Sequence, residues 1–322
     1  MATLRILLLA LLAMVLCCGQ ARAGTADAVV VWVDSYHQGY EWSDGIERGI
    51  RSVLDPVGVR LQVIRLDAKL NPAEETVRKA GKAARDAIAR IGPAAVIASD
   101  DAAQEYLVVP HLKGAALPVV FCGVNWDATM YGYPAPNVTG MVEVEAVPEM
   151  VSHFARDAKG DRIGYISGDT ATDRKIVEVF NRTHFDGRMR AYFAETFEQF
   201  KSLFLRAQSE TDMLFLRNNA GISGWDPAAA EAFLRDNTRA PTGSHLLHMD
   251  RYVVYTMGKV PEEQGEWAAR TVLRVLAGES PGSIPLGRNQ RTRLVVNLKM
   301  AKAAGVVLPI SVLKTAEVIG KD

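Results

Sequence analysis

The apolar positions of the chain alternate between short continuous runs and spacings of three or four residues. Residues 29–33 form the first run, VVVWV, as expected for a strand buried on both faces of a parallel sheet. Beyond Ser43, apolar residues recur at Ile46 and Ile50, which is helical spacing. Ser43 is predicted to cap this helix. The pattern therefore predicts a strand and a helix joined by a loop at 34–42.

The alternation continues through the first third of the chain. Asn71 and Pro72 are predicted to open a long helix, as its N-cap and its first residue. This order of elements predicts a parallel sheet with helices on both faces. Further strands are predicted at 61–66, 95–99 and 117–124, and helices at 71–91 and 101–109.

Residues 125–136 interrupt this pattern with glycine and proline, and a second alternation follows. Asp226 is predicted to cap the last helix of this second series. Two successive series predict two similar α/β lobes, each doubly wound around a parallel-sheet core. The second series has strands at 162–167, 188–194 and 213–217, and helices at 172–181, 197–207 and 227–236.

The last third of the chain contains too few elements for a third core. A helix at 261–276 and a strand at 293–296 are expected to complete the two lobes, so that the chain crosses between them repeatedly. A seam that is crossed several times is a hinge, and the sequence therefore predicts a clamp. The expected lobes are 24–124 plus 245–287 at the N-terminal side, and 125–244 plus 288–322 at the C-terminal side.

Composition narrows the class of protein. A chain of 322 residues suits two domains, and 48% hydrophobic with 23% charged residues is typical of a soluble globular protein. Lysine plus arginine equals aspartate plus glutamate at 37 each, so the balance gives no indication of a nucleic-acid partner.

The N-terminus resembles a secretory signal. Arg5 precedes an apolar run at 6–16, and Ala21-Arg22-Ala23 fits a cleavage site, so residues 1–23 are predicted to be removed on export to the periplasm. The run is too short to span a bilayer, so we do not expect a membrane-embedded protein. Lipidation at Cys18 remains an alternative, although Val15-Leu16 lacks the small residue usual before a lipidated cysteine.

Polar and aromatic residues follow the predicted strands, where an open α/β sheet binds ligands. The rings of the first loop would stack on a ligand, or would pack the end of the lobe against its own helix. Arg217 with its two neighbouring amides would suit an acidic or polar group, whereas Thr170 has the default role of a helix cap. The candidate ligand-binding residues are Ser35, Tyr36, His37, Tyr40, Trp42, Ser99, Asp100, Asn125, Trp126, Asp169, Thr170, Arg217, Asn218, Asn219 and Trp225.

Signatures of catalysis are absent from the sequence. It contains no G-x-S-x-G, H-E-x-x-H or P-loop motif, and no G-x-G-x-x-G follows the first strand. The six histidines and the carboxylates show no metal-ligand spacing. We therefore expect no catalytic residue, no metal and no cofactor.

Several motifs resemble those of the ABC-transporter substrate-binding protein family that includes tryptophan and tyrosine binders. They are Leu117-Pro-Val-Val-Phe121, Asn137-Val-Thr-Gly140, Glu262-Glu-Gln-Gly265, and 297–305 with Pro309 and Leu313 beyond. The resemblance implies a type I periplasmic-binding-protein fold. It also implies a protein that closes on a small organic ligand and delivers it to an ABC permease.

The first loop, 35–42, departs from the amino-acid binders of that family because it is so aromatic. It resembles a branch that also serves as extracytoplasmic sensor domains, which leaves an alternative in which the protein reports to a membrane histidine kinase. The loop predicts a ligand that is partly aromatic or unsaturated and carries a polar head.

Overall fold

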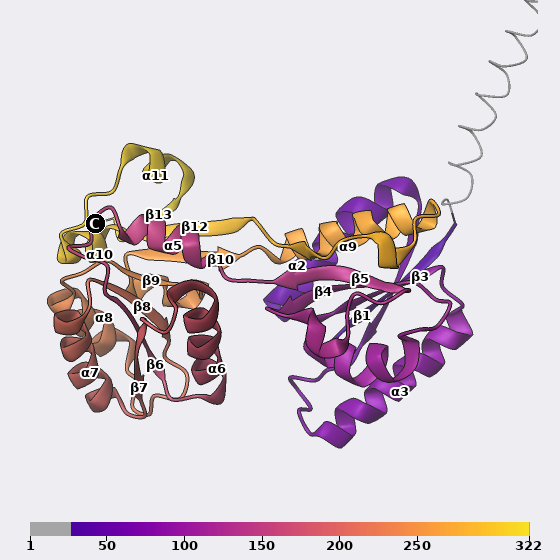
Figure 1. Cartoon of the computed structure of the whole chain (residues 1–322), viewed down its shortest axis with the longest axis horizontal. Coiled ribbons are helices and arrows are strands. Elements are labelled where there is room, and N and C mark those ends of the chain that lie inside the picture. The colour runs from indigo at the N-terminus through magenta and orange to yellow at the C-terminus, as the bar shows by residue number, and fades with distance from the viewer. Residues whose placement is uncertain (1–26, 322) are drawn as a thin grey trace, which may run out of the picture. The chain divides into compact units, whose positions relative to one another are not determined.

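The computed structural model describes residues 27–321, and the predicted signal peptide with Cys17 and Cys18 lies outside them. The described chain forms two compact units (Figure 1). The first unit runs to Val144 and takes up the chain again at Val260–Asn289, while the second contains Glu145–Lys259 and the chain from Gln290 onward. The predicted class, two doubly wound α/β lobes crossed repeatedly by the chain, is confirmed.

The first unit is built on a six-stranded sheet in the order β11-β5-β4-β3-β1-β2. Every pairing in it is parallel. Its strands are β1 (Val29–Asp34), β2 (Arg60–Arg65), β3 (Ala95–Ser99), β4 (Val119–Asn125), β5 (Val138–Glu143) and β11 (Gly287–Arg288). Its helices are α2 (Glu41–Leu54), α3 (Glu74–Ile91), α4 (Asp100–Ala103) and α9 (Pro261–Leu276). A π-helical segment at Gln104–Leu112 continues α4, and short 3₁₀ turns lie at Asp55–Val57, Ala128–Tyr131 and Pro281–Ser283.

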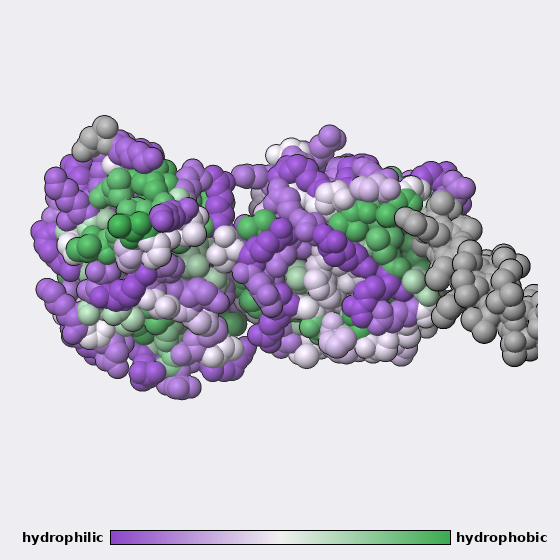
Figure 2. Space-filling view, turned by 90° about the horizontal axis from the view of Figure 1, so that it is seen from above, coloured by the Kyte–Doolittle hydropathy of each residue, from purple (hydrophilic) through white to green (hydrophobic). Residues whose placement is uncertain are grey.

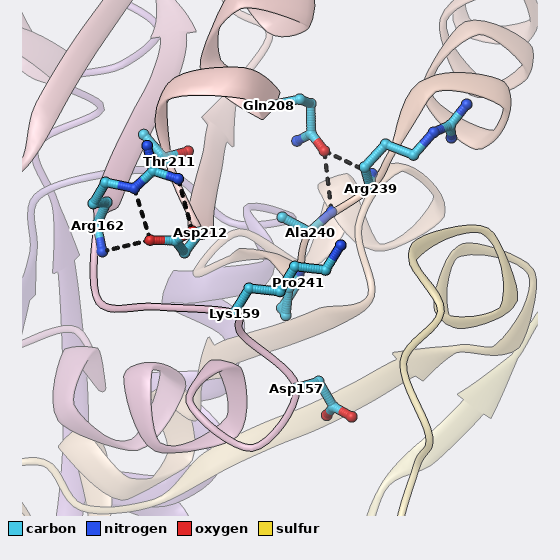
Figure 3. A pocket seen from close by; sticks show the side chains of 9 residues that line it. All are labelled: Asp157, Lys159, Arg162, Gln208, Thr211, Asp212, Arg239, Ala240 and Pro241. Atoms are coloured by element: carbon cyan, nitrogen blue, oxygen red, sulfur yellow. Dashed lines mark hydrogen bonds and ion pairs between the residues drawn. The ribbon is translucent and has the colours of Figure 1, made fainter.

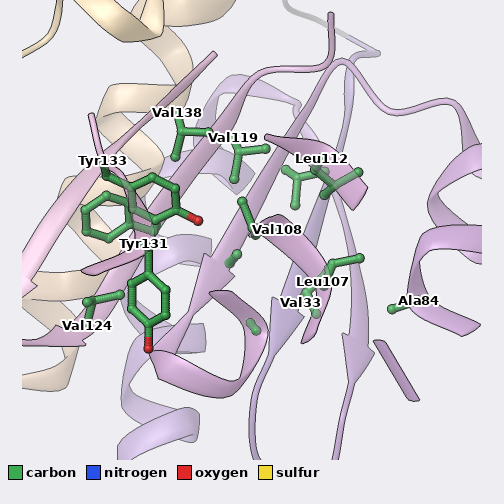
Figure 4. Close-up of a cluster of buried hydrophobic side chains, with 14 of the residues drawn as sticks. Val33, Ala84, Leu107, Val108, Leu112, Val119, Val124, Tyr131, Tyr133 and Val138 are labelled. Carbon is green, nitrogen blue, oxygen red and sulfur yellow. The ribbon is translucent and has the colours of Figure 1, made fainter. Parts of the chain in front are cut away.

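Both faces of this sheet are covered, as the continuous apolar strands predict. Val31 and Val33 of β1 pack into a cluster with Ala84 of α3 and with Leu107 (Figure 4). The alternate residue Trp32 faces the other side, in a cluster with residues of α2 and α9. Successive side chains of a strand point to opposite faces, so one strand supplies both cores.

Helices α2 and α9 pack at very short range, although they are far apart in the sequence. A Cβ placed on Gly49 would lie 2.2 Å from the carbonyl oxygen of Glu262, and one on Gly265 would lie 2.1 Å from that of Ile46. These glycines are present because the two backbones approach too closely for any side chain. The contact joins the Val260–Asn289 segment to the first unit.

The second unit contains a seven-stranded sheet in the order β13-β12-β10-β9-β8-β6-β7. Its pairings are parallel except that β12 runs antiparallel to β10. Its strands are β6 (Ile163–Gly168), β7 (Arg190–Ala194), β8 (Met213–Asn218), β9 (Thr242–Ser244), β10 (Tyr255–Lys259), β12 (Thr292–Asn297) and β13 (Glu317–Ile319). Its helices are α5 (Val147–Phe154), α6 (Ala171–Phe180), α7 (Phe197–Glu210), α8 (Pro227–Asn237), α10 (Leu298–Ala304) and α11 (Ile310–Thr315), with shorter turns at Asn181–Phe185 and Leu247–Tyr252.

The unit boundaries differ from those expected from the sequence. Residues 125–144 belong to the first unit, because β5, which the sequence analysis did not predict, pairs with β4. Residues 245–259 belong to the second unit, because β10 pairs with β9 and β12. Strand pairing is a long-range property, so a pause in the local pattern did not locate these boundaries.

Two predicted helix caps are wrong and one is confirmed. Ser43 lies inside α2, where its hydroxyl donates to Asp34 Oδ1 at 2.8 Å. Helix α3 begins at Glu74 after Ala73, so Asn71 does not cap it. Asp226 does cap α8, where Oδ1 accepts from the backbone N–H of Ala229 at 2.7 Å.

The surface seen in Figure 2 is mostly hydrophilic, with apolar patches on both units. Val307 and Ile310, 78% and 72% exposed, are the most exposed large apolar side chains between residues 27 and 321. No helix in that range is both long enough and apolar enough to cross a membrane.

Candidate functional site

The ends of four neighbouring strands bring the candidate residues of the first unit together. Since β1, β3, β4 and β5 are parallel, their carboxyl ends meet at one edge of the sheet, where the register pairs Asp34 with Ser99 and Asn125 with Glu143. Ser35 and Tyr36 follow β1 at this edge. The loops that follow these strands therefore meet at one edge of the first sheet.

Two of the candidate hydroxyls at this edge are used by the fold. Ser35 Oγ donates to the carbonyl oxygen of Ser99 at 2.5 Å and accepts from the backbone N–H of Ala103 at 2.8 Å. Ser99 Oγ accepts from the indole N–H of Trp32 at 3.1 Å. Both serines are fully buried. The Ser35 hydroxyl holds the first loop to α4, and the Ser99 hydroxyl joins β3 to β1.

Asp100 is a buried carboxylate in an unusual backbone conformation. It has a φ of +65° and is only 2% exposed. The indole N–H of Trp42 donates to Oδ1 at 2.9 Å, whereas Oδ2 is buried without a hydrogen-bond partner. Burial raises the pKa of Asp100 well above its ordinary value, and the nearby charges of Glu143 and Asp34 add to the effect. A buried carboxylate with an unpaired oxygen and a positive φ lowers the stability of the fold, and such residues cluster at functional sites.

The next side chains along this edge are joined by hydrogen bonds. Asn125 Nδ2 donates to Asp101 Oδ2, and the Tyr131 hydroxyl donates to Asp101 Oδ1, each at 2.8 Å. Trp126 has a φ of +56°, and its backbone N–H donates to the carbonyl oxygen of Glu143 at 3.0 Å. The side-chain amide of Asn125 is thus oriented by Asp101, and its Oδ1 atom can act as an acceptor.

The rings of the first loop form an aromatic group around a lysine. Tyr36 and Tyr40 meet edge to face with centroids 5.2 Å apart, and His37 lies 5.7 Å from Tyr40. The ammonium nitrogen of Lys69 lies 4.2 Å from the centroid of Tyr36 and 3.8 Å from that of Tyr40, and it donates to the Tyr40 hydroxyl. Burial, followed by the charges of Asp100 and Glu143, raises the pKa of Tyr36, which stays a neutral phenol.

In the second unit, Arg217 lies one residue before the end of β8 and is a buried cation with N–H groups that have no acceptor. It is 7% exposed and donates through Nη2 to Glu145 Oε1 at 3.1 Å, while Nε and Nη1 are buried without hydrogen-bond partners. Lys259 also donates to Glu145 Oε1, at 3.4 Å. Two cationic side chains thus contact this carboxylate, and the two N–H groups of Arg217 without acceptors suit an anionic ligand group.

His245, beside this group, is a core residue. It is 2% exposed and stacks on Phe215 with centroids 5.3 Å apart. Burial lowers its pKa to about 3, with the charge of Glu145 opposing the shift and that of Arg217 adding to it. The imidazole is therefore neutral and adds no charge beside the guanidinium.

The remaining candidates of the second unit have structural partners. Asp169 forms a two-pronged ion pair with Arg174, with both distances 2.6 Å, and Thr170 caps α6 by accepting from the backbone N–H of Asp173. Asn218 Oδ1 accepts from the backbone N–H of Ala220 at 3.0 Å, and the carbonyl oxygen of Asn219 accepts from Ile222. The contacts of Asn218 and Asn219 shape the turn after β8.

Trp225 packs within an aromatic cluster of the second unit. Its ring lies 5.4 Å from Phe197, 5.0 Å from Phe200 and 5.4 Å from Tyr252, and its N–H donates to the Tyr252 hydroxyl at 3.4 Å. This half-buried tryptophan therefore has a packing role within its own unit.

Sequence reasoning did not select Lys69, Glu143, Glu145 or Lys259. Lys69 lies in a turn after β2, which carries no ligand signal of its own. Glu143 ends β5, a strand that the sequence pattern did not reveal, and Glu145 lies two residues beyond it. Lys259 ends β10. An acidic pair flanking a valine directly after an apolar run, Glu143-Val-Glu145, is the signal that could have indicated them.

A separate small pocket of about 140 Å³ lies at the opposite, amino-terminal edge of the second sheet (Figure 3). There Arg162 forms a two-pronged pair with Asp212, at 2.9 Å for each contact, and Gln208 Oε1 accepts from the N–H groups of Arg239 and Ala240. These bonds tie loops together at the base of the sheet. Within residues 27–321, no group of three or more metal-ligating side chains is present.

Comparisons with known proteins agree with this architecture. Residues 251–319 match the family model described as ABC transporter substrate binding protein. An ABC domain from Streptococcus pneumoniae, in complex with L-Trp, is 16% identical with a TM-score of 0.58, and the match covers 91% of this chain and 100% of that one. No curated protein matches the chain.

Two further structures share the fold. A ligand-free, open structure of a substrate binding protein with adhesive properties from Clostridium difficile is 13% identical with a TM-score of 0.70, covering 92% of this chain and 100% of that chain. A conserved domain protein from Vibrio cholerae is 19% identical with a TM-score of 0.57, covering 91% and 99%. At these identities the likeness shows the fold.

The architecture, two α/β units crossed repeatedly by the chain, is the type I periplasmic-binding-protein fold. The resemblance to ABC-transporter substrate-binding proteins is confirmed, by the family match over 251–319 and by the shared fold over most of the chain.

Proposed function

We propose that this protein is a periplasmic solute-binding protein that closes on a small organic ligand and delivers it to an ABC permease. The observation that carries the ligand-binding part is the buried guanidinium of Arg217, which has two N–H groups without partners. A buried donor without an acceptor costs on the order of 1–3 kcal/mol, and an anionic or polar ligand group would remove that cost. The family match and the fold are those of binding proteins, which supports binding rather than catalysis.

Closure is the mechanism that we propose. A ligand that contacts the carboxyl-end loops of both units only when they come together shifts the population to the closed form by its differential affinity. Export through the N-terminal signal would place the protein beside its permease. The mature chain is expected to begin near Gly24, and the intact mass of exported protein would show whether it does.

A ligand screen tests the proposed function. Thermal-shift measurements with aromatic acids, aromatic amino acids, aliphatic amino acids and sugars are expected to select compounds with a polar or anionic head. Against the selected compound, Arg217→Ala is expected to weaken binding at least tenfold, because a charge-assisted hydrogen bond to a buried group is lost.

Arg235→Ala is the matched control in the same unit, since Arg235 pairs with Asp236 on the exposed surface. It is expected to leave affinity unchanged. If Arg217→Ala and Arg235→Ala bind equally well, Arg217 is not the anchor. The sensor alternative, in which a membrane kinase reads the closed form, is not favoured by the comparisons.

A further inference from the structure

The Lys69 ammonium occupies the aromatic face of the first loop. It lies over two tyrosine rings, at 4.2 Å from the centroid of Tyr36 and 3.8 Å from that of Tyr40. The turn that carries it is held against the first loop, because the backbone N–H of Asp67 donates to the carbonyl oxygen of Tyr36 at 3.1 Å. Cations are attracted to the negative face of an aromatic ring, and two rings around one cation form the usual site for ammonium ligands.

A second, independent feature of the same edge also points to a cation. Asp100 is buried, and its Oδ2 atom has no hydrogen-bond partner. The charges of Asp100 and Glu143 contribute, after burial, to the raised pKa of Tyr36, so both carboxylates act on the phenol at the aromatic group. In the part of the chain that the structure describes, Oδ1 of Asp100 accepts from the Trp42 indole and Oδ2 accepts from no lysine or arginine. The edge thus holds a buried carboxylate whose charge its own unit does not balance.

Lys69 does not form an ion pair that would balance the charge of Asp100. Its side chain is exposed, and its ammonium contacts the two tyrosines rather than a carboxylate. A strongly hydrated primary ammonium at the surface gains little there, whereas an alkylated ammonium sheds its water more readily and would gain more from contact with the rings.

We propose that this edge of the first unit binds the substituted ammonium group of the ligand, which takes the place of the Lys69 ammonium against Tyr36 and Tyr40 and is neutralised by Asp100. The inference rests on the proposed function and names the ligand class, an organic cation. In this arrangement Lys69 competes with the ligand.

A matched pair of probes isolates the charge. Calorimetric titration of the full mature protein with choline and with its neutral isostere 3,3-dimethylbutan-1-ol is expected to show binding of choline and at least tenfold weaker binding of the alcohol. Glycine betaine, which adds a carboxylate, is expected to bind at least as tightly as choline. If anionic or neutral compounds bind and neither ammonium compound does, this inference is wrong and the proposed function stands. If no compound of either kind binds, both fail.

Variants test the individual groups. Tyr36→Leu is expected to weaken choline binding about tenfold and Tyr36→Phe to preserve it, because the phenylalanine ring keeps its face. Asp100→Asn is expected to weaken choline binding while leaving the alcohol unaffected. Lys69→Ala is expected to tighten choline binding, and the control Lys79→Ala, which removes an exposed lysine paired with Glu75, is expected to change nothing. Unchanged or weaker binding by Lys69→Ala would overturn the assignment of Lys69 as a competitor.

Discussion

At the scale of single residues, the motifs that carry the family resemblance hold the fold. Asn137 accepts from the backbone N–H of Gly114 at 2.7 Å and donates to the carbonyl oxygens of Leu112 and Leu117 at 2.9 and 2.8 Å. Asn297 caps α10 by accepting from Met300. Such residues specify the fold and leave the ligand open. The candidate ligand-binding residues, such as Asp100, lie outside these motifs.

Replacement of Asp100 is expected to stabilise the protein at neutral pH. The pKa of Asp100 is raised above 3.8 by burial, so the folded state holds the proton more tightly than the unfolded state does. The charged side chain therefore costs stability at pH 7, and the cost fades as the pH falls through the raised pKa toward 3.8. Asp100→Asn should raise the melting temperature by a few degrees at pH 7, and the gap from wild type should shrink on acidification.

Asp86→Asn is the control for this prediction. Asp86 is exposed, and the hydrogen bond from Arg85 lowers its pKa, so its removal should not stabilise the protein. A melting-temperature gap for Asp100→Asn that stayed constant between pH 7 and pH 4 would show that the carboxylate charge is not the cause.

At the scale of elements, the packing of α2 on α9 explains why glycines lie inside these two helices. From the sequence alone, a glycine inside a helix is expected to lower stability by about 0.5–1 kcal/mol relative to alanine. Gly45, Gly49 and Gly265 instead lie where a Cβ would come within 2.3 Å of the partner helix. Close approach of the backbones therefore outweighs helix propensity in this contact.

Gly49→Ala is expected to destabilise the protein by about 1–3 kcal/mol, because the added Cβ would lie 2.2 Å from the carbonyl oxygen of Glu262 and would push the helices apart. Chemical denaturation followed by circular dichroism measures this change. Ser52→Ala, on the exposed side of α2, should shift stability by at most about 0.5 kcal/mol. A stabilised Gly49→Ala protein would mean that the packing yields to the methyl group.

At the scale of the whole molecule, the chain passes between the two units at 144/145, 259/260 and 289/290. Each unit contains its own sheet and its own charged group at the carboxyl ends of the strands. Multiple crossings let the units move as bodies while staying connected, which is the requirement for closure on a ligand.

Closure should be visible in solution. Small-angle X-ray scattering is expected to show a smaller radius of gyration once a ligand selected by the screen is added, because closure makes the molecule more compact. The Arg217→Ala variant at the same ligand concentration, where it is largely unbound, is the control and should keep the larger radius. Tight binding with an unchanged scattering curve would contradict the clamp.

The sequence by itself determined the alternation of strands and helices, because apolar periodicity is local. It thereby determined that Tyr36, Asp100 and Asn125 follow strands of a parallel sheet, which is enough to predict that such loops meet at one edge. It did not predict β5, and consequently it misplaced the unit boundary near 125 and missed Glu143.

Only the tertiary structure decided what each polar atom is used for. The hydroxyls of Ser35 and Ser99 are taken by backbone and indole partners, while Asp100 Oδ2 and two nitrogens of Arg217 have none. Lys69 enters the candidate site from a turn that follows a different strand. Strand order and side-chain partners depend on contacts between residues far apart in the chain, and those contacts form only when the sheets assemble.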